Sequence, residues 1–213
     1  GIFTLQNAIN TSGSAAQIGD LHPVPHKGVL PLVAKFSPCD SLECTRACWQ
    51  NRLSRVKVRT GDELRDRLLN GFVKYQALAC RVFARTGLYQ PGGAYGMRDQ
   101  LQDMLCVLYM EPALVRAHLL RCAAHQFEDG DGMHWWHEPY SGVRTRISDD
   151  MLFLPFVTAE YVRTTGDADV LRETVPYLQN VEIPEGREDR YGEAEPSDVR
   201  ESLHGHCMRA FRR

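Results

Sequence analysis

The sequence lacks a long apolar run and a sizeable net charge, and each absence excludes a class of protein. No hydrophobic stretch among its 213 residues approaches the roughly 18 residues that span a bilayer. No Lys/Arg-led apolar segment near its beginning resembles a signal peptide. The formal net charge is −2, so electrostatics gives no reason to expect contact with nucleic acid or with an anionic membrane.

Cysteine is present in a number and pattern that disfavour a disulfide framework. The chain holds seven cysteines, and several stand alone in helical patterns, as Cys80, Cys106 and Cys122 do. This use is typical of free thiols in a reducing compartment. We therefore expect a cytoplasmic location.

Strict apolar–polar alternation, the pattern of a half-buried strand, is almost absent. Only Val56-Lys57-Val58 shows it. Apolar residues recur instead at three- and four-residue steps, as they do along amphipathic helices. The sequence therefore predicts a mainly α protein, with helices over about 42–56, 60–83, 99–109, 112–127 and 148–165, and a last one from Ser197 or Asp198.

Capping and turn residues suggest where these elements begin and end. Thr60 or Asp62 suits an N-cap, Pro112 a first helical turn, and Gly166 the residue after a helix. Residues 1–41 have no clear period and are interpreted as an irregular or linker segment, and 42–59 as a linker helix. The glycine-rich stretch around 92–96, together with 128–148 and 180–198, is predicted as loop.

These loops carry most of the groups that could bind a ligand. The candidates near the glycine-rich stretch are Arg85, Tyr89, Gln90, Arg98, Asp99, Gln102 and Asp103. Those in and after 128–148 are His134-Trp135-Trp136-His137, Arg144, Arg146, Asp149 and Asp150. Carboxylates and guanidiniums bind sugar hydroxyls, and an indole packs on the apolar face of a sugar ring. The alternative is helix capping by Asp99, Asp149 and Asp150, with surface ion pairs elsewhere.

A metal site has less support. His134 and His137 have no Cys or acid at a matching interval, and adjacent tryptophans are poor metal surroundings. Cys39, Cys44 and Cys48 lack a fourth partner, and their spacings are unusual for zinc. We therefore expect no bound metal.

From about Thr60 onward, several motifs resemble those of one enzyme family. They are Leu69-Asn70-Gly71-Phe72, Tyr75 through Arg81, Tyr89 through Asp103, His125-Gln126-Phe127, His134-Trp135-Trp136-His137, Val143 through Asp150, and Ser202-Leu203 with His206-Cys207. The family is glycoside hydrolase family 94, the inverting glycoside phosphorylases. The resemblance is strongest to the phosphorylase-like region of cyclic β-1,2-glucan synthases and to 1,2-β-oligoglucan phosphorylases. It does not extend to residues 1–41.

This resemblance implies a fold and a reaction. The fold is an (α/α)6 barrel, a ring of paired helices whose loops build a pocket at one end. Residues 60–213 would form its N-terminal part, a partial barrel that is incomplete at its C-terminal side. Family members split a β-glucosidic bond with inorganic phosphate to give an α-sugar 1-phosphate. A carboxylic acid protonates the leaving oxygen while phosphate attacks the opposite face of the sugar. Phosphate is a co-substrate, and no cofactor is implied.

The resemblance also implies roles for particular residues. Arg98 and Asp99 match residues that hold hydroxyls of the transferred sugar in subsite −1, and Arg85 matches an arginine that contacts phosphate. Gln102 and Trp136 complete the predicted substrate contacts. Ala94-Tyr95 stand where disaccharide phosphorylases of the family carry a further arginine, which disfavours cellobiose or chitobiose and favours a β-1,2-glucan.

The family's general acid lies in an Asp-Trp-Asn-Asp motif downstream of the segment matched by residues 202–209, and this motif does not occur in the chain. The chain starts at Gly1 without a methionine and stops at Phe211-Arg212-Arg213 within a helical pattern. We therefore expect a fragment that needs the remainder of its parent polypeptide, contains no assigned catalytic residue and is inactive alone. The alternative is a non-catalytic carbohydrate-binding or structural helical domain of a larger glucan synthase.

Overall fold

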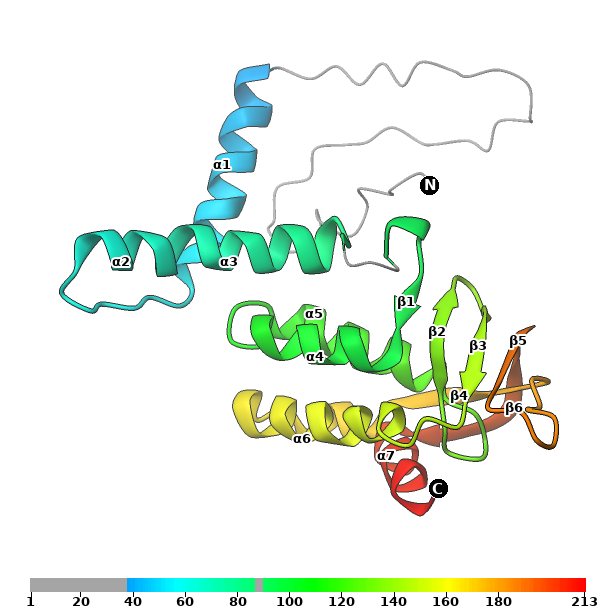
Figure 1. Cartoon of the computed structure of the whole chain (residues 1–213). Coiled ribbons are helices and arrows are strands. Elements are labelled where there is room, and N and C mark those ends of the chain that lie inside the picture. The colour runs from blue at the N-terminus through cyan, green and yellow to red at the C-terminus, as the bar shows by residue number, and fades with distance from the viewer. Residues whose placement is uncertain (1–37, 87–89) are drawn as a thin grey trace. The chain divides into compact units, whose positions relative to one another are not determined.

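The computed structural model describes residues 38–86 and 90–213 (Figure 1). Contacts divide the chain after Thr45, and Arg46–Arg213 forms one compact unit. The segment 1–41, predicted to be irregular, lies outside the described residues except for 38–41, which begin helix α1 (Pro38–Ser54).

A long helix follows α1. The segments α2 (Glu63–Arg67), η2 (Leu68–Phe72), α3 (Val73–Gln76) and η3 (Ala77–Phe83) continue one another along a single axis (Figure 1). The helix begins after Asp62, whose carboxylate accepts a hydrogen bond from the Arg65 N–H, so the predicted N-cap is confirmed. Trp49 of α1 packs against Tyr75, with ring centroids 4.7 Å apart. Lys74 donates to the Leu53 carbonyl at 2.6 Å, which satisfies the last turn of α1.

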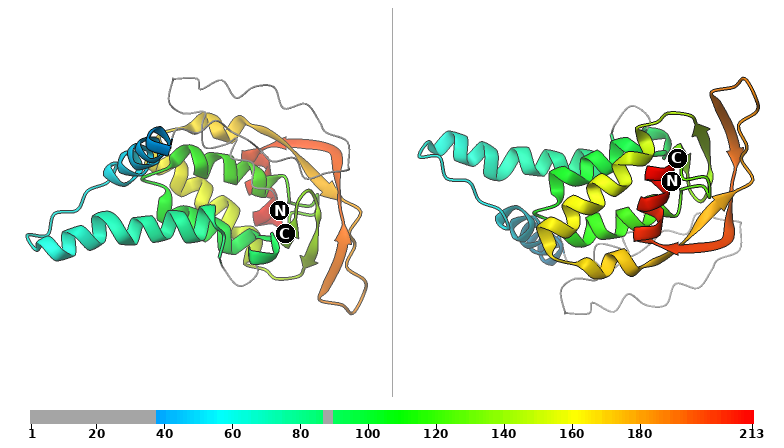
Figure 2. Two further views of the ribbon diagram at one scale, coloured as in Figure 1. Left: turned by 90° about the horizontal axis from the view of Figure 1, so that it is seen from above. Right: turned by 90° about the horizontal axis from the view of Figure 1, so that it is seen from below.

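Four further helices build the core. They are α4 (Met97–Val107), α5 (Pro112–Ala123), α6 (Phe153–Thr165) and α7 (Leu203–Arg212). The first three pack on one another in pairs, and α7 packs on α6 (Figures 1 and 2). Their apolar faces supply fully buried side chains, among them Leu101, Leu119, Leu154 and Leu203. Hydrophobic burial between helices therefore holds the unit together.

The ends of these helices test the sequence predictions. Pro112 stands in the first turn of α5, and Gly166 ends α6 with a left-handed φ of 74°, so both predictions are confirmed. The prediction that the last helix starts at 197–198 is wrong. α7 begins after Ser202, whose hydroxyl accepts from the Gly205 N–H as an N-cap.

Two antiparallel sheets are present, and most of their strands lie in stretches that the sequence predicted as loop, which corrects that prediction. One has the order β1 (Tyr95–Gly96), β2 (Met133–His137), β3 (Ser141–Thr145), β5 (Asp189–Glu193), and the other pairs β4 (Thr174–Gln179) with β6 (Glu195–Ser202). Short helical turns complete the order: η4 (Gln90–Gly92), η5 (Asp150–Leu152) and η6 (Ala168–Arg172). The prediction of a mainly α chain is confirmed, with these sheets added.

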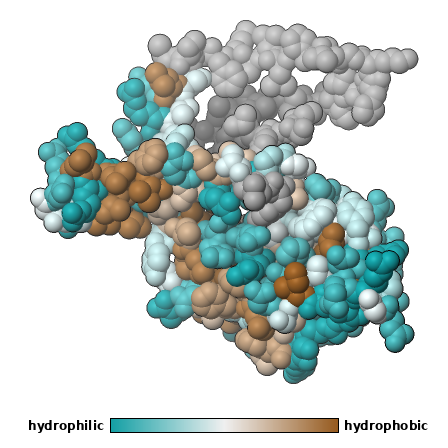
Figure 3. Space-filling model, viewed as in Figure 1, coloured by the Kyte–Doolittle hydropathy of each residue, from teal (hydrophilic) through white to brown (hydrophobic). Residues whose placement is uncertain are grey.

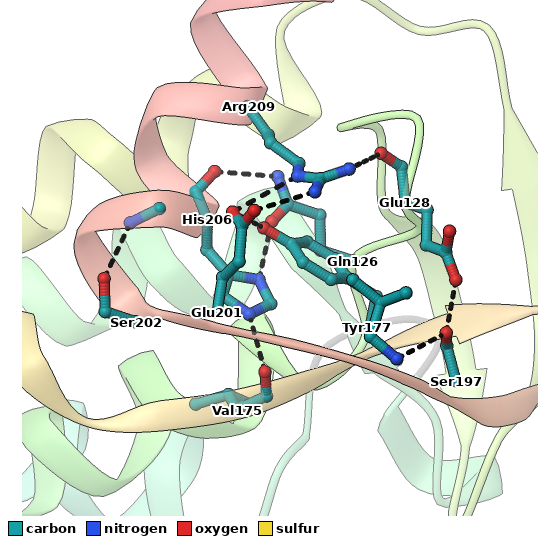
Figure 4. A network of polar contacts seen from close by, with 11 residues as sticks. Gln126, Glu128, Val175, Tyr177, Ser197, Glu201, Ser202, His206 and Arg209 are labelled. Atoms are coloured by element: carbon teal, nitrogen blue, oxygen red, sulfur yellow. Dashed lines mark hydrogen bonds and ion pairs between the residues drawn. The ribbon is translucent and has the colours of Figure 1, made fainter.

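A network of polar contacts ties the β4–β6 pair to α7 (Figure 4). The fully buried His206 ring has Nδ1 2.8 Å from Gln126 Oε1 and Nε2 3.1 Å from the Val175 carbonyl oxygen. Arg209 forms an ion pair with Glu201 at 2.8 Å and donates to the Glu128 carbonyl at 2.7 Å. These groups satisfy one another, so the network is structural.

Candidate functional site

The glycine-rich stretch places the first predicted residues at the start of α4. Gly93 has a φ of 92°, which favours glycine, and its N–H closes a turn on the Gln90 carbonyl at 2.8 Å. Gly96 is extended and precedes the helix, so Arg98 and Asp99 fall in its first turn. Gln102 follows Asp99 by three residues and shares its face of the helix.

All three of these side chains are exposed. Within the described residues, neither Asp99 nor Gln102 makes a hydrogen bond or an ion pair, and neither Asp99 nor Asp149 makes a capping hydrogen bond. The structure therefore gives no support to the helix-capping alternative for these two acids, and leaves the Asp99 carboxylate available to a ligand.

Strand pairing brings the second group of predicted residues to the same place. Tyr95 pairs with Trp136 and Gly96 with Trp135. His134 lies one residue before Trp135 on β2, and α4 begins one residue after Gly96. The two stretches, which are distant in sequence, therefore meet through β1 and β2.

Two close polar pairs join the start of α4, strand β2 and turn η5. Arg98 Nε lies 3.2 Å from Asp149 Oδ2, with both side chains about half exposed, and the Arg98 guanidinium lies 5.3 Å from the centre of the Phe153 ring. His134 Nδ1 lies 2.6 Å from Asp150 Oδ2, and the Asp150 side chain is only 4% exposed. The site thus pairs two hydrogen-bond donors, Arg98 and His134, with two carboxylate acceptors, Asp149 and Asp150.

The electrostatic setting of His134 favours its charged form. The hydrogen bond to Asp150 raises the pKa of His134, and the carboxylates of Asp99 and Asp149 act in the same direction against the effect of burial. The protonated His134 ring would therefore add a second cation beside Arg98.

Trp136 does not fit its predicted role. Its side chain is fully buried, and its ring stacks with those of Tyr95, at 5.6 Å, and His125, at 4.1 Å between centroids. A fully buried indole leaves no surface for a sugar ring, which is at odds with the prediction of a direct contact. Its neighbour Trp135 is only partly buried and packs near Tyr191.

Arg85 lies at the end of the same aromatic stack. Its guanidinium is 3.6 Å from the Tyr95 ring centre, and Nη2 donates to the carbonyls of Gly93, at 2.9 Å, and Ala94. These contacts hold the glycine-rich stretch against β1. The predicted phosphate contact of Arg85 stays a prediction.

Other candidates take structural roles. Asp103 pairs with Arg81 at 2.9 Å. Arg144 is buried and donates to both Asp131 oxygens, at 2.8 and 2.7 Å, and to Asp129. Such a bidentate pair compensates the cost of burying both charges. Tyr89 lies outside the described residues.

The histidines predicted as a possible metal pair have partners of their own. His134 bonds to Asp150, and His137 Nε2 lies 3.1 Å from the Gly92 carbonyl oxygen. In the part of the chain that the structure describes, no three His, Cys, Asp or Glu side chains gather as metal ligands would. The cavity of about 230 Å³ lined by Glu128, Asp129, Glu201, Arg209 and Arg212 lies away from these residues.

Comparison with known proteins decides the family. The sequence model of the Glycosyl hydrolase 94 superfamily, catalytic domain, matches residues 48–212. The chain belongs to this family. Among its relatives, the cyclic beta-(1,2)-glucan synthase NdvB of Rhizobium meliloti (strain 1021) is 42% identical over 172 residues, which cover 80% of this chain and 6% of that protein.

Two phosphorylases are more distant relatives. The N,N'-diacetylchitobiose phosphorylase of Vibrio furnissii is 27% identical, covering 61% of this chain and 20% of that protein. The solabiose phosphorylase of Paenibacillus borealis is 31% identical, covering 58% and 15%. The chain thus spans about a fifth or less of the length of these relatives. Among its described residues, no helix is long and apolar enough to cross a membrane.

Proposed function

We propose that the chain is part of a glycoside phosphorylase-type enzyme that acts on β-1,2-glucans. The family match over residues 48–212 carries the proposal. The relative at 42% identity, a cyclic beta-(1,2)-glucan synthase, supports the β-1,2 linkage. The enzyme would exchange a β-glucosidic bond for a bond to inorganic phosphate with inversion, giving glucose 1-phosphate and needing no cofactor.

In this proposal, Arg98, Asp99 and Gln102 bind hydroxyls of the transferred sugar. Their shared exposed face, and the unpaired state of Asp99 and Gln102 within the described residues, support the assignment. Arg85 would contact phosphate. Trp136 is not retained as a direct contact, because it is enclosed; it supports the site through Tyr95.

The proposal extends to the fold and the compartment. The pairwise packing of α4, α5 and α6 supports a partial (α/α)6 ring. The described cysteines are all free thiols, and Cys122 and Cys207 are buried, which supports a cytoplasmic location. The general acid would stand elsewhere in the full-length protein, so none of the acids of this chain is assigned that role.

The decisive test uses the full-length protein that contains this chain. We expect it to release α-glucose 1-phosphate from β-1,2-linked gluco-oligosaccharides only when inorganic phosphate is present. Phosphorus NMR would identify the product and its anomeric form. Sugar binding without phosphate-dependent release would favour the non-catalytic, carbohydrate-binding alternative instead.

A single substitution tests the role of Asp99. In the full-length protein, Asp99→Asn should leave the fold intact, because the side chain is exposed and unpaired within the described residues. It should cost about 2 kcal/mol or more of transition-state binding, because a charge-assisted hydrogen bond to a hydroxyl is lost. The measurement is kcat/KM, and an unchanged value would remove Asp99 from the site.

A further inference from the structure

A His–Asp pair stands beside the proposed sugar contacts, and its geometry leaves one ring nitrogen unused. His134 Nδ1 meets the Asp150 carboxylate at 2.6 Å. Because a carboxylate accepts, Nδ1 carries the proton and the ring orientation is fixed. Nε2 has no hydrogen-bond partner among the described residues, and the His134 side chain is 38% exposed. Nε2 is therefore available to hydrogen-bond a ligand at the surface.

The buried position of Asp150 suits it to orient the His134 ring. The residue is 3% exposed, and its second oxygen, Oδ1, is buried without a hydrogen-bond partner in the described part of the chain. Burying a carboxylate in this way is costly unless its charge is used. The hydrogen bond to His134 compensates part of this cost.

The charges around Nε2 suit a neutral polyhydroxylated ligand better than an anion. Asp99 and Asp149 act on His134 together with Asp150, and Arg98 is already paired with Asp149 at 3.2 Å. Three carboxylates around one histidine repel phosphate. A sugar hydroxyl, in contrast, can donate to Asp99 and accept from or donate to Nε2.

We propose that His134 is a further sugar-binding residue of this site, with Asp150 as its positioning residue. The inference rests on the proposed function, since the ligand is the same β-1,2-linked glucan. Nε2 would bind a hydroxyl next to the one held by Asp99, so that residues of both α4 and β2 contact the sugar.

The test is direct binding to the full-length protein without phosphate, so that no turnover occurs. Calorimetry with a β-1,2-linked glucotriose gives the Kd of each variant. His134→Asn keeps a donor where Nδ1 stands but removes Nε2, and we expect a Kd about tenfold larger. His134→Gln reaches the Nε2 position and should restore part of the binding. His204→Asn, at an exposed histidine of α7, is the matched control and should bind as the wild type does.

A pH series separates a positioning role for Asp150 from a merely structural one. Since Asp150 raises the pKa of His134, Asp150→Asn should move the pH dependence of Kd to lower pH, and His134→Asn should flatten it. If the wild type binds the glucan and His134→Asn binds it equally well, the inference is overturned while the proposed function stands. If the wild type neither binds the glucan nor releases glucose 1-phosphate, the proposed function itself fails and takes the inference with it.

Discussion

The pKa values of His118 and His134 are shifted in opposite directions within one fold. His118 lies buried on α5, and its Nε2 has no hydrogen-bond partner among the described residues. Burial lowers the pKa of His118 to about 3, and the charges of Arg121 and Arg85 add to the effect. His134 has Asp150 instead, and its pKa is raised. Burial without a counter-charge and burial beside a carboxylate therefore give opposite pH responses.

His118 should make the fold sensitive to acid. In the unfolded chain a histidine titrates near 6.5, so between about pH 6.5 and pH 3 the unfolded state binds a proton that the folded state refuses. Stability therefore falls as the pH falls through this window. From pH 7 to pH 5 the loss due to His118 is about 2 kcal/mol.

The substitution His118→Leu should remove this part of the loss, because leucine cannot bind the proton. Urea unfolding at pH 7 and at pH 5, for the wild type and the variant, measures the difference. An equal loss of stability in both proteins would show that other groups cause the acid sensitivity.

At the scale of elements, the helices could be predicted from the sequence and the strands could not. Amphipathic spacing and capping residues mark the helices, as Asp62 and Pro112 do. Strand β2 does not show the apolar–polar alternation of a strand, because a bulge between Met133 and Trp135 shifts its register. Strand β5 has almost no buried residue. The candidate residues near α4 could be named from their chemistry, but the meeting of His134 with Asp150 depends on strand pairing that no local pattern reveals.

The β2–β3 hairpin depends on a close backbone approach at Gly142. A Cβ there would lie 2.2 Å from the Trp135 carbonyl oxygen and 2.7 Å from Trp136 Cα. Gly142→Ala should therefore destabilise the protein by about 1–3 kcal/mol, because the strands must separate locally. Gly71→Ala is the control: no neighbouring atom lies within 4 Å of its added carbon, and alanine favours the helix there by about 0.5–1 kcal/mol.

Denaturant unfolding of both alanine variants compares the two sites. The prediction for the hairpin is contradicted if Gly142→Ala unfolds at the same urea concentration as the wild type. If Gly71→Ala loses as much stability as Gly142→Ala, the loss does not come from the close backbone approach in the hairpin.

At the scale of the whole unit, one apolar face of the long helix is left exposed by the residues that the structure describes. Leu64, Leu68 and Phe72 follow one another at four-residue steps and are 80%, 49% and 59% exposed. Figure 3 shows the apolar surface over this helix at the left of the molecule. Each such side chain that stays in water forgoes roughly 1.5–3 kcal/mol of burial. Helix faces of this kind are normally covered by another helix or another molecule.

We therefore expect the isolated 213-residue chain to associate as its concentration rises, with this face as the contact. Replacing Leu64, Leu68 and Phe72 together by glutamine removes the apolar surface without changing the charge, and should shift the protein toward the monomer. Replacing Arg65 and Arg67, which are exposed on the same helix, by glutamine is the control and should leave the apolar contact intact. Sedimentation velocity over a concentration series measures each distribution. A monodisperse wild-type monomer at every concentration would show that this face needs no partner in solution, and association unchanged by the triple substitution would place the contact on another surface.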